Sequence, residues 1–576
     1  MDITIEKMDV HYASIRVAWD AEVLARIKTT LGRQYHASGK FWSIPIDQVI
    51  EYAKREQQRG HRVIAPATFQ RELSERQRMT QAFANTMFRD NIDEFVTPST
   101  IVTEPRPYQA VAATAMGLIP GGMLLADPVG VGKTLEAILD HELNGYRQGA
   151  NSILWIVPST LRRNIRNQYK RHMGLTDDEV DELVTVIGDV SVPKRKKQWL
   201  EPTDIKIVGY EMYLRYDWNK PHVPREWNKI YADEVTKIKN RKSHANVNLR
   251  KVVATHGITG MTATPLETKL EDVFQIMDVL RPGVFGNYFQ FADEYLVRNK
   301  FGIVVGANRD SVGKFSEQLA PYMVKRSKEK LMPWLPPKVP IDITVSMPPD
   351  ERKLYENIAN NFTQWVRERQ GKDASTDALV KLLRLRQFAD SPNIVDPTSM
   401  VVGEKMRALF DIMECHKDDS VIIFSQWAQA AERIAEELSA QGYPVEFAKG
   451  GTDYFPITER INNGEHIVLV TTDAGAYGLD MYGAHVIVHY DPLWNPAKME
   501  EQREGRLHRG DQKEPVLVYT LIVEDTFECV TLEVERWRSQ LASAVYDGAE
   551  MSMLSKWSAD DWEMAVHGRL PEGTWS

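Results

Sequence analysis

The chain is 576 residues long, and a chain of this length folds as several domains rather than one. Hydrophobic residues make up 43% of the sequence and charged residues 26%, which is typical of a globular protein and excludes a disordered or fibrous one. The formal net charge of −9 argues against a protein that coats nucleic acid through bulk positive charge.

The two cysteines, Cys415 and Cys529, have no Cys/His cluster near them, so we expect neither a disulfide framework nor a zinc site. The first residues, MDITIEKMDV, include acids and no apolar signal-peptide core, and no apolar run is long enough to span a bilayer. We therefore expect no membrane partner. We also expect a monomer. It would be cytoplasmic and nucleoid-associated if bacterial or viral, and nuclear if eukaryotic.

The first elements indicate a small α/β domain over residues 1–66. Alternating apolar residues over 15–19 predict a half-buried strand, and Asp20 is placed to cap the helix that follows. FWSIPI (41–46) predicts another strand, and Asp47 is placed to open a helix that ends before Gly60. The polar, helix-prone residues 67–102 then predict a helical linker.

Two larger α/β lobes are expected, over residues 103–284 and 403–528. Runs such as ILWIV (153–157) are apolar throughout, as in strands buried on both faces of a parallel sheet. The stretch 285–402 between the lobes is predicted to be a mostly helical insertion. Residues 529–576 are predicted to form a helical tail. Its first helix is expected to start near Phe527, because Phe527, Val530, Val534, Trp537 and Leu541 are spaced to form one apolar face.

The stretch LLADPVGVGKTLEAIL (124–139) has the GKT ending of a phosphate-binding loop, although Asp127 replaces the usual first glycine. A predicted strand precedes it and a predicted helix follows, which is the context that such a loop needs. Gly130 and Gly132, on either side of Val131, let the backbone come close to phosphates. Lys133 would reach the β and γ oxygens, and Thr134 would supply a hydroxyl to Mg²⁺.

A pair of acids after a later strand strengthens the nucleotide prediction. KIYADEVTKIKN ends its strand at Asp233 and Glu234. Asp233 would hold the magnesium ion, and Glu234 would orient and polarise the attacking water. An acidic pair on the surface is the common alternative for such a dipeptide alone.

Basic residues cluster despite the negative net charge. Arg162, Arg163, Arg166 and Lys170 lie in one segment without acids, and PKRKK (193–197) and KIKNRK (237–242) follow. Such clusters neutralise nucleic-acid phosphates. Solvated helix faces are the alternative reading.

Several of these motifs together resemble a known family. DPVGVGKT, DEVTKIKN, GMTATP (260–265), VIIFSQW (421–427), TTDAGAYGLDMYGAHVIVHYDPLWNP (471–496) and QREGRLHRGDQ (502–512) are similar, in order and spacing, to the motifs of helicase superfamily 2. In detail they resemble the Swi/Snf-type ATPases, which are double-stranded DNA translocases. That family often has an acid where Asp127 stands. Thr236 departs from it, because the family has histidine at this position of the DEAH-like motif.

The resemblance implies two RecA-like lobes that use ATP and Mg²⁺, and it implies roles for further residues. Gln109 would read the adenine. Gln502, Arg506 and Arg509 would present the second lobe to the triphosphate, with Asp480 holding them in line and the arginines meeting the developing charge. The hydroxyls implied to contact the DNA backbone are those of Ser159, Thr262, Thr264, Thr471 and Thr472, although Thr and Ser often only cap helices.

The segment VAWDAEVLARIKTTLGRQYHASGKFWSIPI (17–46) resembles the HARP domain of annealing helicases. Trp42, with Tyr35 and Phe41 beside Arg33 and Lys40, would suit unstacked bases at a junction. These aromatic residues could equally be core residues of a structural cap.

The leading hypothesis is an ATP-driven motor on double-stranded or forked DNA that anneals strands, remodels forks or displaces bound proteins. A strand-separating DNA or RNA helicase is the alternative among enzymes. A DNA-binding scaffold without hydrolysis is a third possibility, which intact Lys133, Asp233, Glu234 and Arg509 argue against.

Overall fold

The structure is a computed structural model. It describes the whole chain except residues 10, 19, 93–94, 189, 215–222, 264–269, 299–303, 369–374, 396–402, 451, 453, 473–479, 494–498, 500–502, 534–558 and 570–576. The chain divides into two compact units, Met1–Leu331 and Met332–Ser576, which are described one after the other. Within the described ranges, no helix combines the length and the apolar character that a bilayer span requires.

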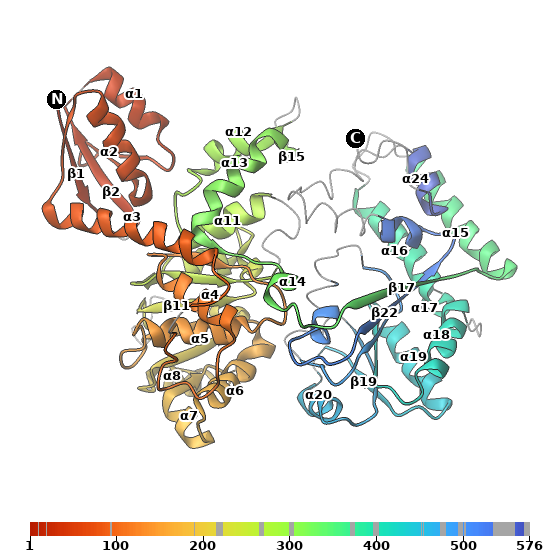
Figure 1. The fold of residues 1–576 in the computed structure, drawn as a ribbon. Coiled ribbons are helices and arrows are strands. Elements are labelled where there is room, and N and C mark those ends of the chain that lie inside the picture. Colours follow the sequence, from red (N-terminus) through yellow and green to blue (C-terminus); the bar gives the residue numbers. More distant parts are fainter. Residues whose placement is uncertain are drawn as a thin grey trace. The chain divides into compact units, whose positions relative to one another are not determined.

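The first unit begins with a small five-stranded sheet of order β3-β4-β2-β1-β5 (Figure 1). Asp20 caps α1 as predicted, by accepting the N–H of Val23 at 2.9 Å. Asp47 lies inside the 3-10 turn Ile46–Gln48 instead of capping the helix that follows. The bounds are β1 (Asp2–Lys7), β2 (Tyr12–Val17), α1 (Ala21–Thr29), β3 (Gln34–His36), β4 (Phe41–Pro45), α2 (Val49–Gln58) and β5 (Arg62–Ile64).

The predicted linker is largely the helix α3 (Ala67–Met87), and it is packed against the large domain that follows. Phe83 is 4% exposed and belongs to the same apolar core as Ile101 and Met116. The small domain is also anchored by Arg281, which donates to the two carboxylate oxygens of Asp47 at 2.6 and 2.7 Å. The small domain, α3 and the first lobe therefore pack as one body.

The first lobe is built on a parallel sheet of order β16-β6-β13-β11-β7-β9-β8. The run ILWIV forms β7 (Ile153–Val157), and its side chains enter two different apolar cores. Leu154 and Ile156 belong to one core, and Trp155 belongs to the other. The sheet is therefore covered on both faces, as its apolar strands predict. The other strands are β6 (Met123–Leu125), β8 (Val184–Val186), β9 (Ile205–Gly209), β11 (Lys229–Asp233), β13 (Ile258–Met261) and β16 (Met323–Val324).

Helices and short strands complete the first unit (Figure 1). They are α4 (Pro107–Gly117), α5 (Lys133–Leu143), α6 (Arg162–Met173), α7 (Asp177–Leu183), α8 (Val192–Leu200), α9 (Tyr210–Leu214), β10 (Glu226–Trp227), α10 (His244–Leu249), β12 (Val253–Ala254), α11 (Leu270–Leu280), α12 (Tyr288–Tyr295), β14 (Leu296–Arg298), β15 (Val304–Ala307), α13 (Arg309–Leu319) and α14 (Lys328–Leu331).

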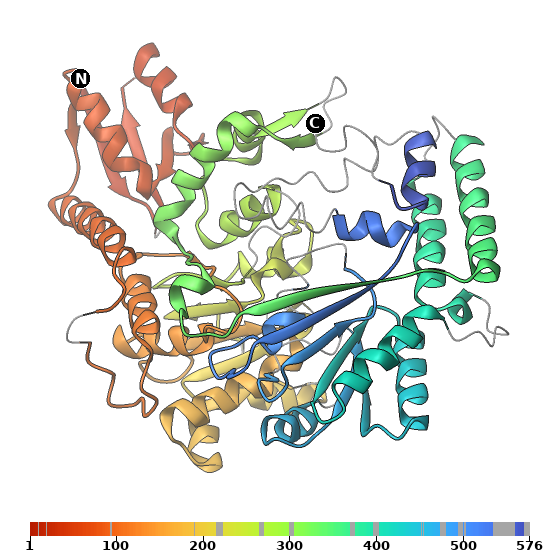
Figure 2. The ribbon, with the colours of Figure 1, turned by 45° about the vertical axis from the view of Figure 1, so that its right-hand side comes forward.

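The second unit holds a parallel sheet of order β17-β22-β21-β18-β20-β19. Its edge strand β17 pairs with β22 from Lys338↔Val516 to Val345↔Val523, and Figure 2 shows it as the long green strand beside the blue β22. Its strands are β17 (Lys338–Val345), β18 (Val421–Ser425), β19 (Val445–Ala448), β20 (Val468–Thr472), β21 (Val486–His489) and β22 (Val516–Val523). Its helices are α15 (Pro349–Glu368), α16 (Ser375–Asp390), α17 (Pro392–Val395), α18 (Glu404–Cys415), α19 (Ala428–Ala440), α20 (Phe455–Asn462) and α24 (Ala559–Val566).

The stretch 285–402, which was predicted to be mostly helical, contains helices α12 to α17 and also four described strands. β14 and β15 pair with each other, β16 joins the first sheet and β17 joins the second. β16 is too short to show a period, and the half-exposed β17 lacks a long apolar run. Residues 527–533 are helical as predicted, and the further positions of that apolar face, Val534, Trp537 and Leu541, lie outside the described residues.

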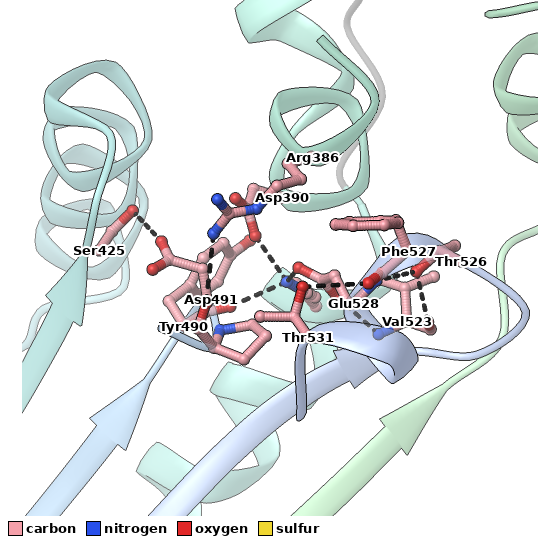
Figure 3. A network of polar contacts seen from close by, with 12 residues as sticks. Arg386, Asp390, Ser425, Tyr490, Asp491, Val523, Thr526, Phe527, Glu528 and Thr531 are labelled. Carbon is pink, nitrogen blue, oxygen red and sulfur yellow. Dashed lines mark hydrogen bonds and ion pairs between the residues drawn. The ribbon is translucent and has the colours of Figure 1, made fainter. Parts of the chain in front are cut away.

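A buried ammonium group joins the parts of the second unit. Lys405, at the start of α18, is 1% exposed and donates to Asp390 at 2.6 Å, to the carbonyl of Tyr490 at 2.9 Å and to Glu528. Figure 3 shows Asp390, Tyr490 and Glu528 around this network. Although burial disfavours the charged form, the Asp390 and Glu528 carboxyls raise the pKa of Lys405 above its ordinary value, so the lysine stays charged.

We expect Lys405→Met to destabilise the second unit by about 3–5 kcal/mol, because it leaves buried carboxyls without their counter-charge. Urea unfolding followed by circular dichroism measures the change. Lys417→Met is the matched control, since Lys417 pairs with Glu414 at the surface, and it should shift the midpoint far less. Equal shifts for the two variants would contradict a central role for Lys405.

Candidate nucleotide and DNA site

Candidate residues of the first lobe meet at one edge of its sheet. Because the strands are parallel, their carboxyl ends lie along the same edge. The phosphate loop follows β6, Ser159 follows β7, Asp233 ends β11 and Thr262 follows β13. In the sheet order, only β13 stands between β6 and β11, so the fold brings the loop and the acidic pair to neighbouring positions.

The loop between β6 and α5 needs glycine at two positions. Gly130 and Gly132 have φ angles of 86° and 89°, which L side chains rarely adopt. Gly132 is also the residue before α5, and a Cβ there would lie 2.6 Å from Nε2 of Gln109. The backbone therefore passes closely around the start of α5, where a helix N-terminus favours an anion.

Lys133 and Thr134 are the first residues of α5, and both are half-buried. The ammonium of Lys133 donates to the carbonyls of Asp127 and Pro128, at 2.9 and 3.1 Å. It therefore lies against the loop that a phosphate group would occupy, and phosphate oxygens could replace these carbonyls as acceptors.

Gln109 lies in the first turn of α4 and is 6% exposed. Its amide donates to the carbonyl of Val131 at 2.9 Å, and its oxygen accepts the N–H of Arg106 at 3.0 Å. The side chain thus stabilises the loop through the carbonyl of Val131. Its predicted contact with adenine stays a prediction.

Asp127 has a fully buried carboxylate, which binds the guanidinium of Arg326. The same guanidinium meets Glu136 at 3.3 Å. Burial raises the pKa of Asp127, although the charge of Arg326 opposes this effect. The pKa of Glu136 is raised well above its ordinary value by burial and by the nearby Asp127 carboxylate. Arg326 and Glu136 were not predicted as functional residues. Arg326 lies in the segment YMVKRSKEK (322–330), which has no local pattern that shows which side chain reaches the loop.

Asp233 and Glu234 lie at the end of β11, as predicted. The Asp233 carboxylate accepts the N–H of Glu234 at 3.1 Å. Glu234 has a left-handed backbone with φ 49° and ψ 52°, which is uncommon for a residue other than glycine. Such conformations often occur at functional sites, where the surrounding structure holds them in place. Thr236, which departs from the family pattern, is buried in the turn that follows.

In the second unit, the structure brings Arg509 and Asp480 into contact as an ion pair. The side chain of Arg509 also donates to the carbonyl of Gly505 at 2.9 Å. Arg506 is 4% exposed, and its carbonyl accepts the N–H of Met481, next to Asp480. Gln502 lies outside the described residues.

The basic helix α6 is partly neutralised by its neighbour α7. Arg166 meets Asp177 at 3.2 Å and Asp181 at 2.7 Å, and Lys170 meets Asp177 at 2.7 Å. Arg162 donates to the carbonyls of Ser159 and Ile187, whereas Arg163 is exposed. The cluster is therefore less uniform in charge than its sequence suggests.

The predicted hydroxyl contacts differ in accessibility. Ser159 is half-buried and bonds Glu211. Thr262, Thr471 and Thr472 are 1%, 1% and 7% exposed. Thr471 bonds Tyr454 at 3.1 Å, an internal contact that favours the structural alternative for this residue. Thr264 lies outside the described residues.

Trp42 is half-buried and packs on the core of the small domain. It pairs across the strands with Tyr35, which is 54% exposed, and their ring centroids are 5.0 Å apart. Both alternatives for the aromatic residues thus find support, because Trp42 serves the core while Tyr35 faces solvent. The HARP-like character of residues 1–66 stays a prediction.

Comparisons with known proteins agree with these motifs. A family model described as the SNF2-related domain matches residues 53–394, and one described as the helicase conserved C-terminal domain matches residues 404–511. An uncharacterized ATP-dependent helicase of Mycoplasma pneumoniae is 26% identical over 432 residues, which cover 73% of this chain and 40% of that protein. A putative ATP-dependent helicase/translocase of Bacillus subtilis is 26% identical over 454 residues, which cover 73% of this chain and 46% of that protein.

A mouse SWI/SNF-related matrix-associated actin-dependent regulator of chromatin, subfamily A member 1, is 27% identical over 447 residues, covering 73% of this chain and 41% of that protein. The chain spans less than half the length of these three relatives. Among solved structures, the Sulfolobus solfataricus SWI2/SNF2 ATPase core in complex with dsDNA is 23% identical, covers 83% of this chain and 100% of that chain, and has a TM-score of 0.40.

The match to the SNF2-related domain covers more than half of the chain, and the C-terminal helicase domain follows it in sequence. The first match contains the phosphate loop and the acidic pair, and the second contains Asp480, Arg506 and Arg509. The chain therefore belongs to the Swi/Snf-type helicase family.

Proposed function

We propose that the chain is a DNA-dependent ATPase that moves along double-stranded DNA. The observation that carries this proposal is the edge of the first sheet, where the loop with Lys133 and the pair Asp233 and Glu234 follow strands β6 and β11 of one parallel sheet. A loop that holds phosphates and an acidic pair beside it are the parts that nucleoside triphosphate hydrolysis requires.

The residues at this edge fit ATP and Mg²⁺. The glycine-lined loop and the start of α5 suit a triphosphate, and Thr134 and Asp233 offer the oxygen ligands that Mg²⁺ prefers. When bound, the ion would offset negative charge on the phosphates. Glu234 would orient the attacking water, and Lys133 would exchange loop carbonyls for phosphate oxygens.

From the second unit, Arg506 and Arg509 would meet the charge that develops during phosphoryl transfer. Asp480 would hold the Arg509 guanidinium in the orientation that meets this charge, as their ion pair suggests. The relatives named as ATP-dependent helicases support ATP as the nucleotide.

Duplex DNA is the proposed track. The exposed basic residues of α6 support this choice. Within this function, we propose strand annealing or fork remodelling as the task. The support is the exposed aromatic Tyr35 on the small domain, which could stack on an unpaired base.

Lys133→Ala tests the nucleotide site. We expect turnover to fall by about 10²-fold or more, because the charge that meets the phosphates is removed. Duplex binding without nucleotide should persist, since Lys133 lies in the loop. Lys417→Ala is the surface control and should keep full turnover. ATPase rates with duplex, single-stranded and forked DNA and with RNA identify the track, and a rate in Lys133→Ala near that of the wild type would refute the site.

The charges around α6 predict that substitutions of two of its arginines change the affinity for duplex DNA to different extents. Arg163→Glu should weaken duplex binding and lower the slope of log affinity against log salt by about one, because a phosphate contact is lost. Arg166→Glu should have a smaller effect, since Asp177 and Asp181 already offset its charge. Affinity titrations at several salt concentrations compare them. If neither variant changes the slope, α6 is only a solvated face.

Tyr35→Ala and Trp42→Ala separate base recognition from packing in the small domain. Tyr35→Ala should lower the preference of the ATPase for forked over plain duplex DNA and leave the melting temperature unchanged, because Tyr35 is exposed. Trp42→Ala should lower the fork preference and the melting temperature together, because Trp42 also packs on the core. A well-folded Tyr35→Ala variant with full fork preference would remove the small domain from substrate recognition.

A further inference from the structure

The two ends of the phosphate loop are joined to each other through side chains outside it. At the first end, Arg326 binds the carboxylate of Asp127, with its Nε 3.0 Å from Oδ2. The same guanidinium donates to the carbonyl of Tyr108 at 2.7 Å. At the other end, the hydroxyl of Tyr108 donates to the carbonyl of Val131 at 3.0 Å. Arg326 and Tyr108 thus close a ring around residues 127–131.

The backbone holds Arg326 beside the loop. β16 pairs with β6 in the register Met323↔Leu124 and Val324↔Leu125. The N–H of Ala126 then donates to the carbonyl of Val324 at 2.7 Å. Arg326 therefore leaves the sheet next to Asp127, where the strand pairing sets its position.

The charged side chains beside the loop are buried, which restricts the geometry that they can adopt. Asp127 and Glu136 are fully buried and the Arg326 side chain is 7% exposed, so water does not replace a lost partner. Breaking one member of such a group leaves a charge uncompensated in a medium of low dielectric. The ring is therefore expected to hold one geometry rather than several.

We propose that Arg326 is a positioning residue for the nucleotide. Through Asp127 and Tyr108 it holds the two ends of the phosphate loop at a fixed separation, so that the loop is already shaped for the β and γ phosphates of ATP. Asp127 then anchors the loop instead of touching the nucleotide, which explains why an acid stands where phosphate loops usually begin with glycine. This inference rests on the proposed function and deepens its nucleotide site.

Arg326→Lys tests the proposal, because lysine keeps the charge but lacks the planar fork that reaches both Asp127 and Tyr108. We expect KM for ATP and Kd for a fluorescent ATP analogue to rise about tenfold or more, with kcat changed by less than about threefold. A purely structural role would lower the melting temperature and the active fraction, and hence kcat, and leave KM and Kd unchanged.

A milder variant keeps the test decisive if Arg326→Lys folds poorly. Tyr108→Phe removes only the hydroxyl that binds Val131 and should raise the analogue Kd by roughly threefold. Lys417→Ala is the control, because Lys417 pairs with Glu414 at the surface, and it should keep Kd within about twofold.

The outcomes separate this inference from the proposed function. A wild-type protein that neither binds the analogue nor hydrolyses ATP would refute the function itself. If the wild type is active and Lys133→Ala is inactive, an unchanged KM and Kd in Arg326→Lys, or an unchanged Kd in Tyr108→Phe, would overturn the role of Arg326. A rise in Kd for both variants, without one for Lys417→Ala, supports it.

Discussion

The cost of burying charge governs how the segments of both units are joined. A charged group that leaves water must meet a partner of opposite charge or lose several kcal/mol. Arg281 with Asp47 meets this requirement where the small domain packs on the first lobe, and Arg326 with Asp127 meets it beside the phosphate loop. Lys405 with Asp390 and Glu528 meets it in the second unit. The pairs of Arg281 with Asp47, Arg326 with Asp127 and Lys405 with Glu528 span 234, 199 and 123 residues of sequence, so the charges specify which distant segments come together.

Apolar packing supplies the layers that these pairs align. The buried strands of the first sheet place Leu154 and Trp155 in separate cores on opposite faces. Such packing tolerates exchanges of similar volume, whereas the loss of one partner from a buried ion pair leaves an uncompensated charge. We infer that apolar burial stabilises each lobe, and that the ionic contacts select the positions of the segments that carry chemistry.

The sequence predicted the elements whose signals are local. Runs such as ILWIV reveal a strand buried on both faces, Asp20 reveals a helix start, and the glycines before Lys133 reveal a tight loop. It did not predict β16 or β17, because a two-residue strand has no period and a half-exposed edge strand has no long apolar run. These strands exist because a neighbouring strand offers unpaired backbone groups.

The missed parts of the candidate site depend in the same way on contacts between distant segments. The sequence distance of 199 residues between Asp127 and Arg326 hides their ion pair from any local pattern. The acids of α7 were likewise invisible as partners of Arg166, since only the fold places them against α6. Residue type and spacing therefore predicted the groups that we propose to touch ATP, while the groups that position them required the structure.

Both units present their candidate catalytic groups from segments held by buried charge. In the first unit, Asp127 and Arg326 fix the start of the loop that leads to Lys133. In the second unit, Arg503 is fully buried and meets Asp491 at 3.3 Å, which fixes the segment just before Arg506 and Arg509. Catalysis by charge stabilisation depends on groups that are in place before the reaction begins, because reorganisation costs free energy at the transition state. A buried ion pair behind each group meets that demand better than an exposed one, since water cannot exchange with its partners.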